Sequence, residues 1–169
     1  SISGVSFVVV LVADLLLVAA RTGDGVGVFA VDASGAGLTR VPLQTMDQTR
    51  KQCEVVFDNV AVGRDRLIGM IDMGWPVLLK VLNIATAALC AEMVGGAQRV
   101  LDMSVAYAKE RVQFGRPIGS FQAIKHMCAE MLLRSQQAAT AAADAAVAAS
   151  GDDDQLSIAA AIAAAIGIE

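Results

Sequence analysis

The spacing of apolar and polar residues divides the chain into two parts of different character. Up to about residue 74, short apolar runs alternate with turn-forming residues, a pattern typical of β-strands. From Pro76 onward, long apolar stretches carry polar residues at helical spacing, which predicts helices. The pattern therefore predicts an α+β chain, with part of an antiparallel β-domain in residues 1–75 and long antiparallel helices in residues 76–169.

The first part of the chain carries several strand signals. Residues 7–20, FVVVLVADLLLVAA, are rich in β-branched residues and precede a turn-forming run, so we expect buried core strands there. This run is short for a membrane span, contains Asp14 and lacks the basic start of a signal peptide, so we expect no membrane segment. Further strands are predicted at residues 25–32, 38–44 and 53–62. Pro42 indicates an edge strand, and the glycine-containing residues 63–75 predict a loop.

The first predicted helix begins at Pro76, where the missing N–H of proline is tolerated, and continues to about Arg111. A few polar residues recur at helical spacing and apolar residues fill most other positions. We therefore expect neighbouring structure to cover this helix on most sides. Gly95 and Gly96 are unfavourable in a helix interior, so their presence predicts the close approach of another backbone.

Two more helices are predicted after a junction. The second begins near Ser120, a good N-cap residue, and ends near Ala149. A turn at residues 150–155 follows, and its three aspartates suit the N-terminus of a helix better than a metal site. The third helix is predicted at residues 156–169 and carries no Gly or Pro stop signal at its end. We therefore expect an incomplete helical bundle, which follows an equally incomplete β-domain.

Composition narrows the classes of protein that the chain can represent. Hydrophobic residues make up 56% of the 169 residues but aromatic residues only 4%, so the apolar excess consists of small aliphatic side chains. Such side chains suit close helix packing, and we expect other subunits or domains to cover part of the surface. The net charge of −4 argues against nucleic-acid binding, which needs clustered basic residues.

The cysteines and the single histidine give little sign of chemistry. Cys53, Cys90 and Cys128 are odd in number, far apart and without metal-ligand spacing, so we expect reduced thiols in a cytoplasmic protein. His126 lies within the second predicted helix, and no pattern of nucleophile and orienting acid accompanies it. The sequence therefore predicts neither a catalytic triad nor a metal site.

Residues 107–122, YAKERVQFGRPIGSFQ, are the most distinctive segment. Arginine suits phosphate because its planar guanidinium makes two charge-assisted hydrogen bonds, and Gln113 and Phe114 add an amide and a ring. Gly115 permits a tight turn between the helices. Two interpretations fit these residues: an anion-binding corner, or a basic helix C-terminus in which Arg111 complements the helix dipole.

The ordered string at residues 107–131, YAKERVQFGRPIGSFQAIKHMCAEM, resembles the signature of the flavin-dependent acyl-CoA dehydrogenases. In that family the segment joins two long helices of a C-terminal four-helix domain. Residues 13–32 and 55–75 look like the second half of the family's middle β-domain and its exit loop. Residues 91–111 look like the first helix of its C-terminal domain, so the resemblance covers nearly the whole chain.

The resemblance implies FAD as cofactor and an acyl-CoA thioester as substrate. In the family a carboxylate removes the α-proton, the β-hydrogen leaves as hydride to flavin, and an electron-transfer flavoprotein accepts the electrons. The resemblance assigns Arg111 to the FAD pyrophosphate of a neighbouring subunit and Gln113 to a position beside it. It assigns Phe114 to the adenosine side and Gln122 to the adenine–ribose end. It also implies a tetramer, of one or two kinds of subunit.

The chain departs from the family pattern at the substrate side. Some members place the catalytic carboxylate on the first C-terminal helix, and the matching position here is Ala85. The next position usually holds an arginine and here holds Thr86, while Asn83 matches a polar CoA contact. Two explanations are open: the base lies on a continuation outside these residues, or the chain is a non-catalytic subunit that pairs with a catalytic partner.

Overall fold

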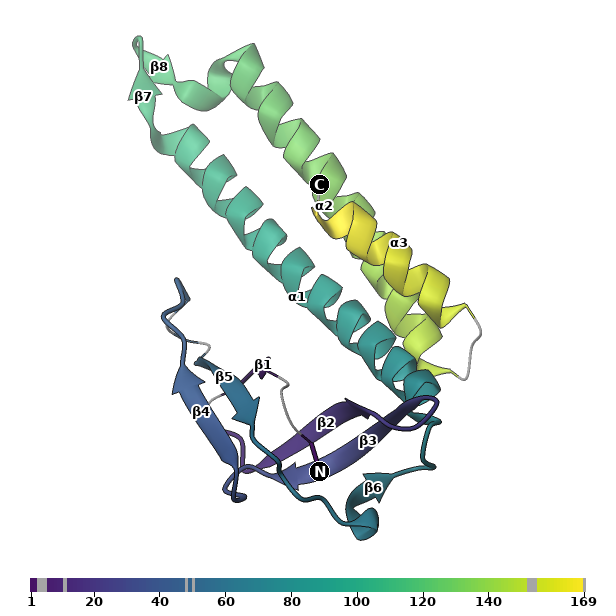
Figure 1. Ribbon diagram of the computed structural model, residues 1–169. Coiled ribbons are helices and arrows are strands. Elements are labelled where there is room, and N and C mark those ends of the chain that lie inside the picture. The colour runs from purple at the N-terminus through teal and green to yellow at the C-terminus, as the bar shows by residue number, and fades with distance from the viewer. Residues whose placement is uncertain (3–5, 11, 48, 50, 152–154, 169) are drawn as a thin grey trace. The chain divides into compact units, whose positions relative to one another are not determined.

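In the computed structural model, antiparallel strands form two three-stranded sheets (Figure 1). One sheet has the order β1 (Ser6–Val10), β5 (Gln52–Phe57), β4 (Leu38–Pro42). The other has the order β2 (Leu15–Arg21), β3 (Val26–Asp32), β6 (Leu67–Ile68), and the short helix η1 (Arg64–Arg66) precedes β6. The structure describes residues 1–168 apart from 3–5, 11, 48, 50 and 152–154, and describes 6–10 by their backbone alone.

The core of this unit forms because successive side chains of a strand point to opposite faces, so that every second apolar side chain is turned inwards. In β2, Leu16 and Val18 are buried, whereas Leu15 and Leu17 face the other way and are exposed. The alternation on β5 buries three side chains that join the same core, those of Cys53, Val55 and Phe57. The prediction of strands within residues 7–20 is confirmed, but β2 is buried on one face only.

Backbone geometry determines where the predicted strands end and which of them lies at the edge of its sheet. Pro42 lies at the end of β4, which is an edge strand as predicted. The strand expected at residues 53–62 ends earlier, at Phe57. Asn59 adopts a positive φ of 51°, which turns the chain out of the ladder, and Val60 then makes only an isolated bridge.

The loop after β6 is tied to the hairpin between β2 and β3. The hydroxyl of Thr22 donates a hydrogen bond to the carboxylate of Asp72, which has a positive φ of 64°. A side chain at Gly25 would overlap the carbonyl oxygen of Asp72, so the close approach requires glycine there. This contact anchors the loop from which α1 (Gly74–Glu110) begins.

Three long helices make up the second part of the chain: α1, α2 (Gln122–Ser150) and α3 (Leu156–Ile168). They run side by side in Figure 1. Their shared core consists of small side chains, those of Ala87, Cys90, Ala141, Ala142, Ala145 and Ala163. The chain divides into two compact units, Ser1–Leu78 and Leu79–Glu169. The predicted α+β fold is confirmed.

α1 is covered less than its sequence predicts. Ala87, Cys90, Leu101 and Ala108 are buried, but most of its large apolar side chains are exposed, because only α2 and α3 contribute to its cover within the described helices. By length and composition alone α1 could cross a membrane, with a mean hydropathy of 1.8 over an 18-residue stretch. Core helices of water-soluble proteins meet the same criterion.

Two local predictions about the helices are not met. Beyond the adjacent backbone of α1 itself, no described atom lies within 4 Å of the position of a Cβ at Gly95 or Gly96, so the expected close approach is not made by the part of the chain that the structure describes. Ser120 is not the N-cap of α2, because Phe121 occupies that position without a side-chain cap bond. The Ser120 hydroxyl instead donates to the Pro117 carbonyl oxygen at 2.7 Å. The predicted aspartate turn at 152–154 lies outside the described residues.

Candidate functional site

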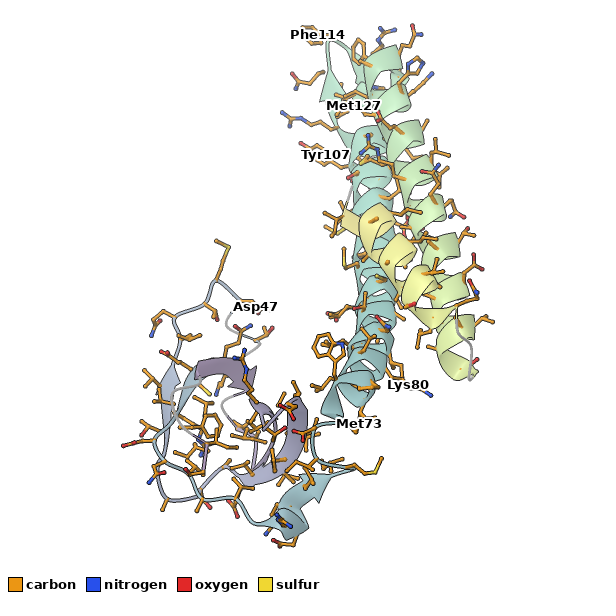
Figure 2. The ribbon with its side chains drawn as sticks, turned by 45° about the vertical axis from the view of Figure 1, so that its right-hand side comes forward. Asp47, Met73, Lys80, Tyr107, Phe114 and Met127 are labelled. Atoms are coloured by element: carbon orange, nitrogen blue, oxygen red, sulfur yellow. The ribbon has the colours of Figure 1, made fainter. Side chains whose placement is uncertain are left out.

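The junction between α1 and α2 is a β-hairpin that sequence reasoning described only as a turn. β7 (Val112–Gln113) pairs antiparallel with β8 (Arg116–Pro117). Phe114 and Gly115 form the two-residue loop, with φ values of 53° and 77°, and two positive φ angles are typical of a type I′ turn. Figure 2 shows Phe114 at the tip of this hairpin and Tyr107 at the end of α1.

The hairpin register places three polar side chains on one face. Gln113 pairs directly with Arg116, and opposed residues of an antiparallel pair share a face. Arg111 lies two residues before Gln113 and therefore shares that face too, since its carbonyl oxygen accepts a hydrogen bond from Ile118 N–H at 2.8 Å. The resulting arginine face consists of Arg111, Gln113 and Arg116, all exposed.

The arginine face carries positive charge that the described residues leave unneutralised. Neither Arg111 nor Arg116 makes an ion pair or side-chain hydrogen bond with any described residue. The Gln113 amide donates to the neighbouring Val112 carbonyl oxygen at 2.9 Å. Two unpaired guanidiniums on one face suit an anion with several oxygens, because each presents a planar set of N–H donors.

An aromatic pair stands beside the arginine face. The rings of Phe114 and Phe121 meet edge to face, with centroids 6.1 Å apart and an interplanar angle of 85°. The Arg116 guanidinium carbon lies 4.2 Å from the centroid of the Phe121 ring. Phe114 is 91% exposed, so its ring is available to a flat ligand.

The segment after the hairpin is held against the end of α1. A Cβ at Gly119 would lie 2.9 Å from the carbonyl oxygen of Ala108, which leaves no room for a side chain. Gly119 belongs to the short helix η2 (Ile118–Ser120), whose following residue, Phe121, caps α2. Gln122 is the first residue of α2, and its amide lies 3.5 Å from His126 Nε2. The predicted cofactor residues 111, 113, 114 and 122 therefore all belong to this one corner.

Asn83 and Thr86, the predicted substrate contacts, lie far from this corner. Both are on the first half of α1, and Thr86 precedes the helix end at Glu110 by about 36 Å at a rise of about 1.5 Å per residue. The Thr86 hydroxyl donates to the Leu82 carbonyl oxygen at 2.8 Å, so its proton is used within the helix. Ala85 beside it has no acidic or basic group. The predicted substrate contacts and the predicted cofactor residues are thus far apart within a single copy of this chain.

No other group in the described residues competes with the corner as a chemical centre. His126 is exposed, and its ring nitrogen Nε2 lies 3.5 Å from the side-chain amide of Gln122. No three His, Cys, Asp or Glu side chains gather in a metal-binding arrangement among the residues described. A groove of about 720 Å³ runs between α2 and α3, with Ile158, Ile162 and Ile166 along its α3 wall.

Comparison with known proteins identifies this architecture. The antiparallel strands and three long helices match part of a FAD-dependent dehydrogenase structure at a TM-score of 0.87 and 26% identity, over 94% of this chain and 44% of that one. The family model "Acyl-CoA dehydrogenase, C-terminal domain" matches residues 72–167. The chain belongs to the acyl-CoA dehydrogenase family, as the motif at residues 107–131 predicts.

Individual relatives agree with this assignment. "Acyl-CoA dehydrogenase FadE34" of Mycobacterium tuberculosis is 60% identical over 91 residues, which are 53% of this chain and 13% of the relative. A structure of the glutaryl-coenzyme A dehydrogenase glutaryl-CoA complex matches at a TM-score of 0.83 and 28% identity, over 92% of this chain and 41% of that one. The chain thus spans less than half the length of each of these three relatives.

Proposed function

We propose that this chain contributes the helical cofactor corner of an acyl-CoA dehydrogenase, which oxidises the α,β-bond of an acyl-CoA thioester with FAD as electron acceptor. In this proposal Arg111, Gln113, Phe114 and Gln122 hold the adenosine-diphosphate half of an FAD bound by a neighbouring subunit. An electron-transfer flavoprotein is the proposed acceptor of the electrons. The chemistry of the family and the chemistry of the corner support the same assignment.

The observation that carries the proposal is the separation of two half-sites along α1, the predicted substrate contacts and the corner. Thr86 lies on α1 about 36 Å before the end of this helix at Glu110, and the arginine face follows directly after that end. A rigid helix cannot fold back, so the substrate half-site and the corner serve different bound molecules or distant parts of an assembly. Exposed apolar side chains along α1, such as Leu82, Leu89 and Val100, offer the surface on which such an assembly would form.

The residues of the corner fit the cofactor that the family uses. Arg111 supplies charge-assisted donors for phosphate oxygens, and the exposed ring of Phe114 offers a flat surface for adenine. Phe114, which has a positive φ, lies at the turn of the hairpin, beyond the end of α1 (Figure 2). When bound, FAD supplies a two-electron acceptor, and this corner supplies binding and orientation.

The substrate half-site favours a second candidate, a non-catalytic subunit that contributes its corner to a catalytic partner. Ala85 stands where some relatives of this family carry the base, and the neighbouring Thr86 hydroxyl is bonded to the Leu82 carbonyl oxygen. No carboxylate on α1 therefore takes the place of that base at this position. In both candidates the corner binds FAD, but only the dehydrogenase supports its reduction by substrate.

Flavin retention and flavin reduction separate these proposals. Purified protein is expected to retain FAD, seen as yellow absorbance, and Arg111→Ala is expected to weaken FAD binding by about 1.5 kcal/mol, roughly tenfold, through loss of a charge-assisted hydrogen bond. Arg99→Ala is the matched control, because Arg99 is an exposed arginine on the same helix, outside the hairpin. Equal FAD affinity in both variants would contradict the role of Arg111.

Reduction by substrate then decides between dehydrogenase and non-catalytic subunit. Straight-chain acyl-CoA thioesters of several lengths are added to the FAD-loaded protein under anaerobic conditions. Bleaching of the flavin is the result expected of a dehydrogenase. FAD that stays oxidised with every thioester supports the non-catalytic subunit, and protein that binds no FAD contradicts both.

A further inference from the structure

The second arginine of the corner, Arg116, has no role in the cofactor assignment above, yet it has the clearest geometry of the three polar residues. Its side chain emerges opposite Gln113, on the same face as Arg111. Its guanidinium is held over the ring of Phe121 at 4.2 Å, whereas no aromatic ring contact of this kind holds Arg111 in the described structure. Arg116 is thus a cation with a defined position.

Stacking on a ring leaves the hydrogen-bonding capacity of arginine intact. The guanidinium uses its π-face or the region near its central carbon to meet the ring, while its N–H donors lie in its plane. Those donors have no partner among the residues that the structure describes. Arg116 therefore combines a fixed position with free donors, which is what preorganised anion binding requires.

We infer that Arg116 is a second phosphate contact of this corner and determines its preference for a diphosphate over a monophosphate, with Phe121 as its positioning residue. This inference rests on the proposed function, because it takes the adenosine diphosphate of the cofactor as the ligand. Arg111 and Arg116 occupy one face of the hairpin, so two cations meet two phosphates. A monophosphate engages only one of them fully.

Phe121 suits a positioning role because it is tied into the fold at several points. Its N–H donates to the Ile118 carbonyl oxygen at 3.0 Å, and its carbonyl oxygen accepts from Lys125 N–H at 3.1 Å in the first turn of α2. Its ring also meets the Phe114 ring in an edge-to-face arrangement, so one ring contacts both the arginine and the tip of the hairpin. Strands of two residues are too short to hold such an arrangement alone.

The test compares ADP with AMP as soluble probes, because the ratio of their affinities cancels the contribution of adenine. In isothermal titration calorimetry the wild-type protein is expected to bind ADP more tightly than AMP. Arg116→Gln is expected to weaken ADP binding by about tenfold, as for loss of one charge-assisted hydrogen bond, and AMP binding by much less. Arg99→Gln, which removes an exposed arginine outside the hairpin, is expected to leave the ratio unchanged.

Variants of Phe121 test whether it acts through Arg116. Phe121→Leu is expected to lower the ratio of the ADP affinity to the AMP affinity. Phe121→Tyr, which keeps an aromatic face, is expected to retain the wild-type ratio. In the Arg116→Gln background, Phe121→Leu is expected to lower this affinity ratio no further, because the effects of substitutions at two interacting residues do not add. Circular dichroism of each variant verifies that the helices are intact.

The outcomes distinguish this inference from the proposal on which it rests. If Arg116→Gln keeps the wild-type ratio while Arg111→Ala still weakens FAD binding, the second contact is refuted and the cofactor corner stands. A further fall of the ratio in the double variant refutes the positioning role of Phe121. Wild-type protein that binds neither ADP nor FAD overturns both.

Discussion

The packing of Gly119 against the end of α1 provides the sharpest test of how the corner is built. Gly119 lies in η2, directly against the backbone of Ala108, which is only 6% exposed. A Cβ at position 119 would stand 2.9 Å from the Ala108 carbonyl oxygen and 3.2 Å from its carbonyl carbon. Gly119→Ala must therefore push η2 away from α1, because backbone atoms of a helix have no other rotamer to adopt.

The magnitude follows from this overlap. Inserting one carbon into a well-packed contact costs about 1–3 kcal/mol. Gly96→Ala provides the opposite case, since beyond the adjacent backbone of α1 a Cβ there has no described atom within 4 Å, and the residue is exposed in the middle of α1. Replacement of an interior helical glycine by alanine is expected to stabilise the helix by roughly 0.5–1 kcal/mol. Replacement of glycine by alanine is thus expected to lower the stability at position 119 and to raise it at position 96.

Thermal unfolding followed by far-ultraviolet circular dichroism measures both effects. For a chain of this size Tm shifts by about 2–4 °C per kcal/mol, so Gly119→Ala is expected to lower Tm by several degrees and Gly96→Ala to raise it slightly. An unchanged Tm for Gly119→Ala would refute the tight contact at Ala108. A lowered Tm for Gly96→Ala would instead reveal a neighbour that approaches this glycine in an assembly.

Three further predictions concern the β-unit. Phe57→Ala removes a ring that is 2% exposed and is expected to destabilise the protein by about 3–5 kcal/mol in urea unfolding; a loss below 1 kcal/mol would contradict its place in the core. Thr22→Val removes the hydrogen bond to Asp72 and is expected to cost about 1 kcal/mol, with hydrogen exchange showing faster opening of the loop before α1; unchanged exchange would refute the tie. The Ser34 hydroxyl and then its backbone N–H, both donating to the Asp32 carboxylate, lower the pKa of that carboxyl below its ordinary value of 3.8. Because this pKa is lower in the folded state, the ionised Asp32 carboxylate stabilises the fold at pH values above its unfolded pKa, and this stabilisation is lost as pH falls through its folded pKa. Ser34→Ala is expected to raise the titration midpoint of the Asp32 carboxyl in NMR. An unchanged midpoint would refute the assignment of the lowered pKa to Ser34.

Local patterns were sufficient to predict the elements and the family. Short apolar runs rich in β-branched residues and bounded by turn-forming residues predict β2 and β5, Pro42 predicts an edge strand, and long apolar stretches predict the three helices. These signals are reliable because each depends on residues a few positions apart. The motif at residues 107–131 likewise identifies the acyl-CoA dehydrogenase family, which the match to residues 72–167 confirms.

Other features depend on conformations that residue types do not specify. Asn59 ends β5 early through a positive φ, and Ser120, a good N-cap by composition, bonds to Pro117 while Phe121 occupies the cap. The glycine pair at residues 95 and 96 suggests close contact, but the contact lies at Gly119. In each case the outcome depends on the path that the backbone takes, which the residue type alone does not specify.

The sequence by itself determined that a basic and aromatic segment joins two long helices, and that Arg111, Gln113, Phe114 and Gln122 lie within it. Tertiary structure alone decided that this segment is a hairpin in which Gln113 opposes Arg116 and Phe121 supports the arginine. The physical reason is that strand register and ring stacking depend on the path of the backbone between the paired residues. That path depends on the positive φ angles at Phe114 and Gly115 and on the contact of η2 with α1.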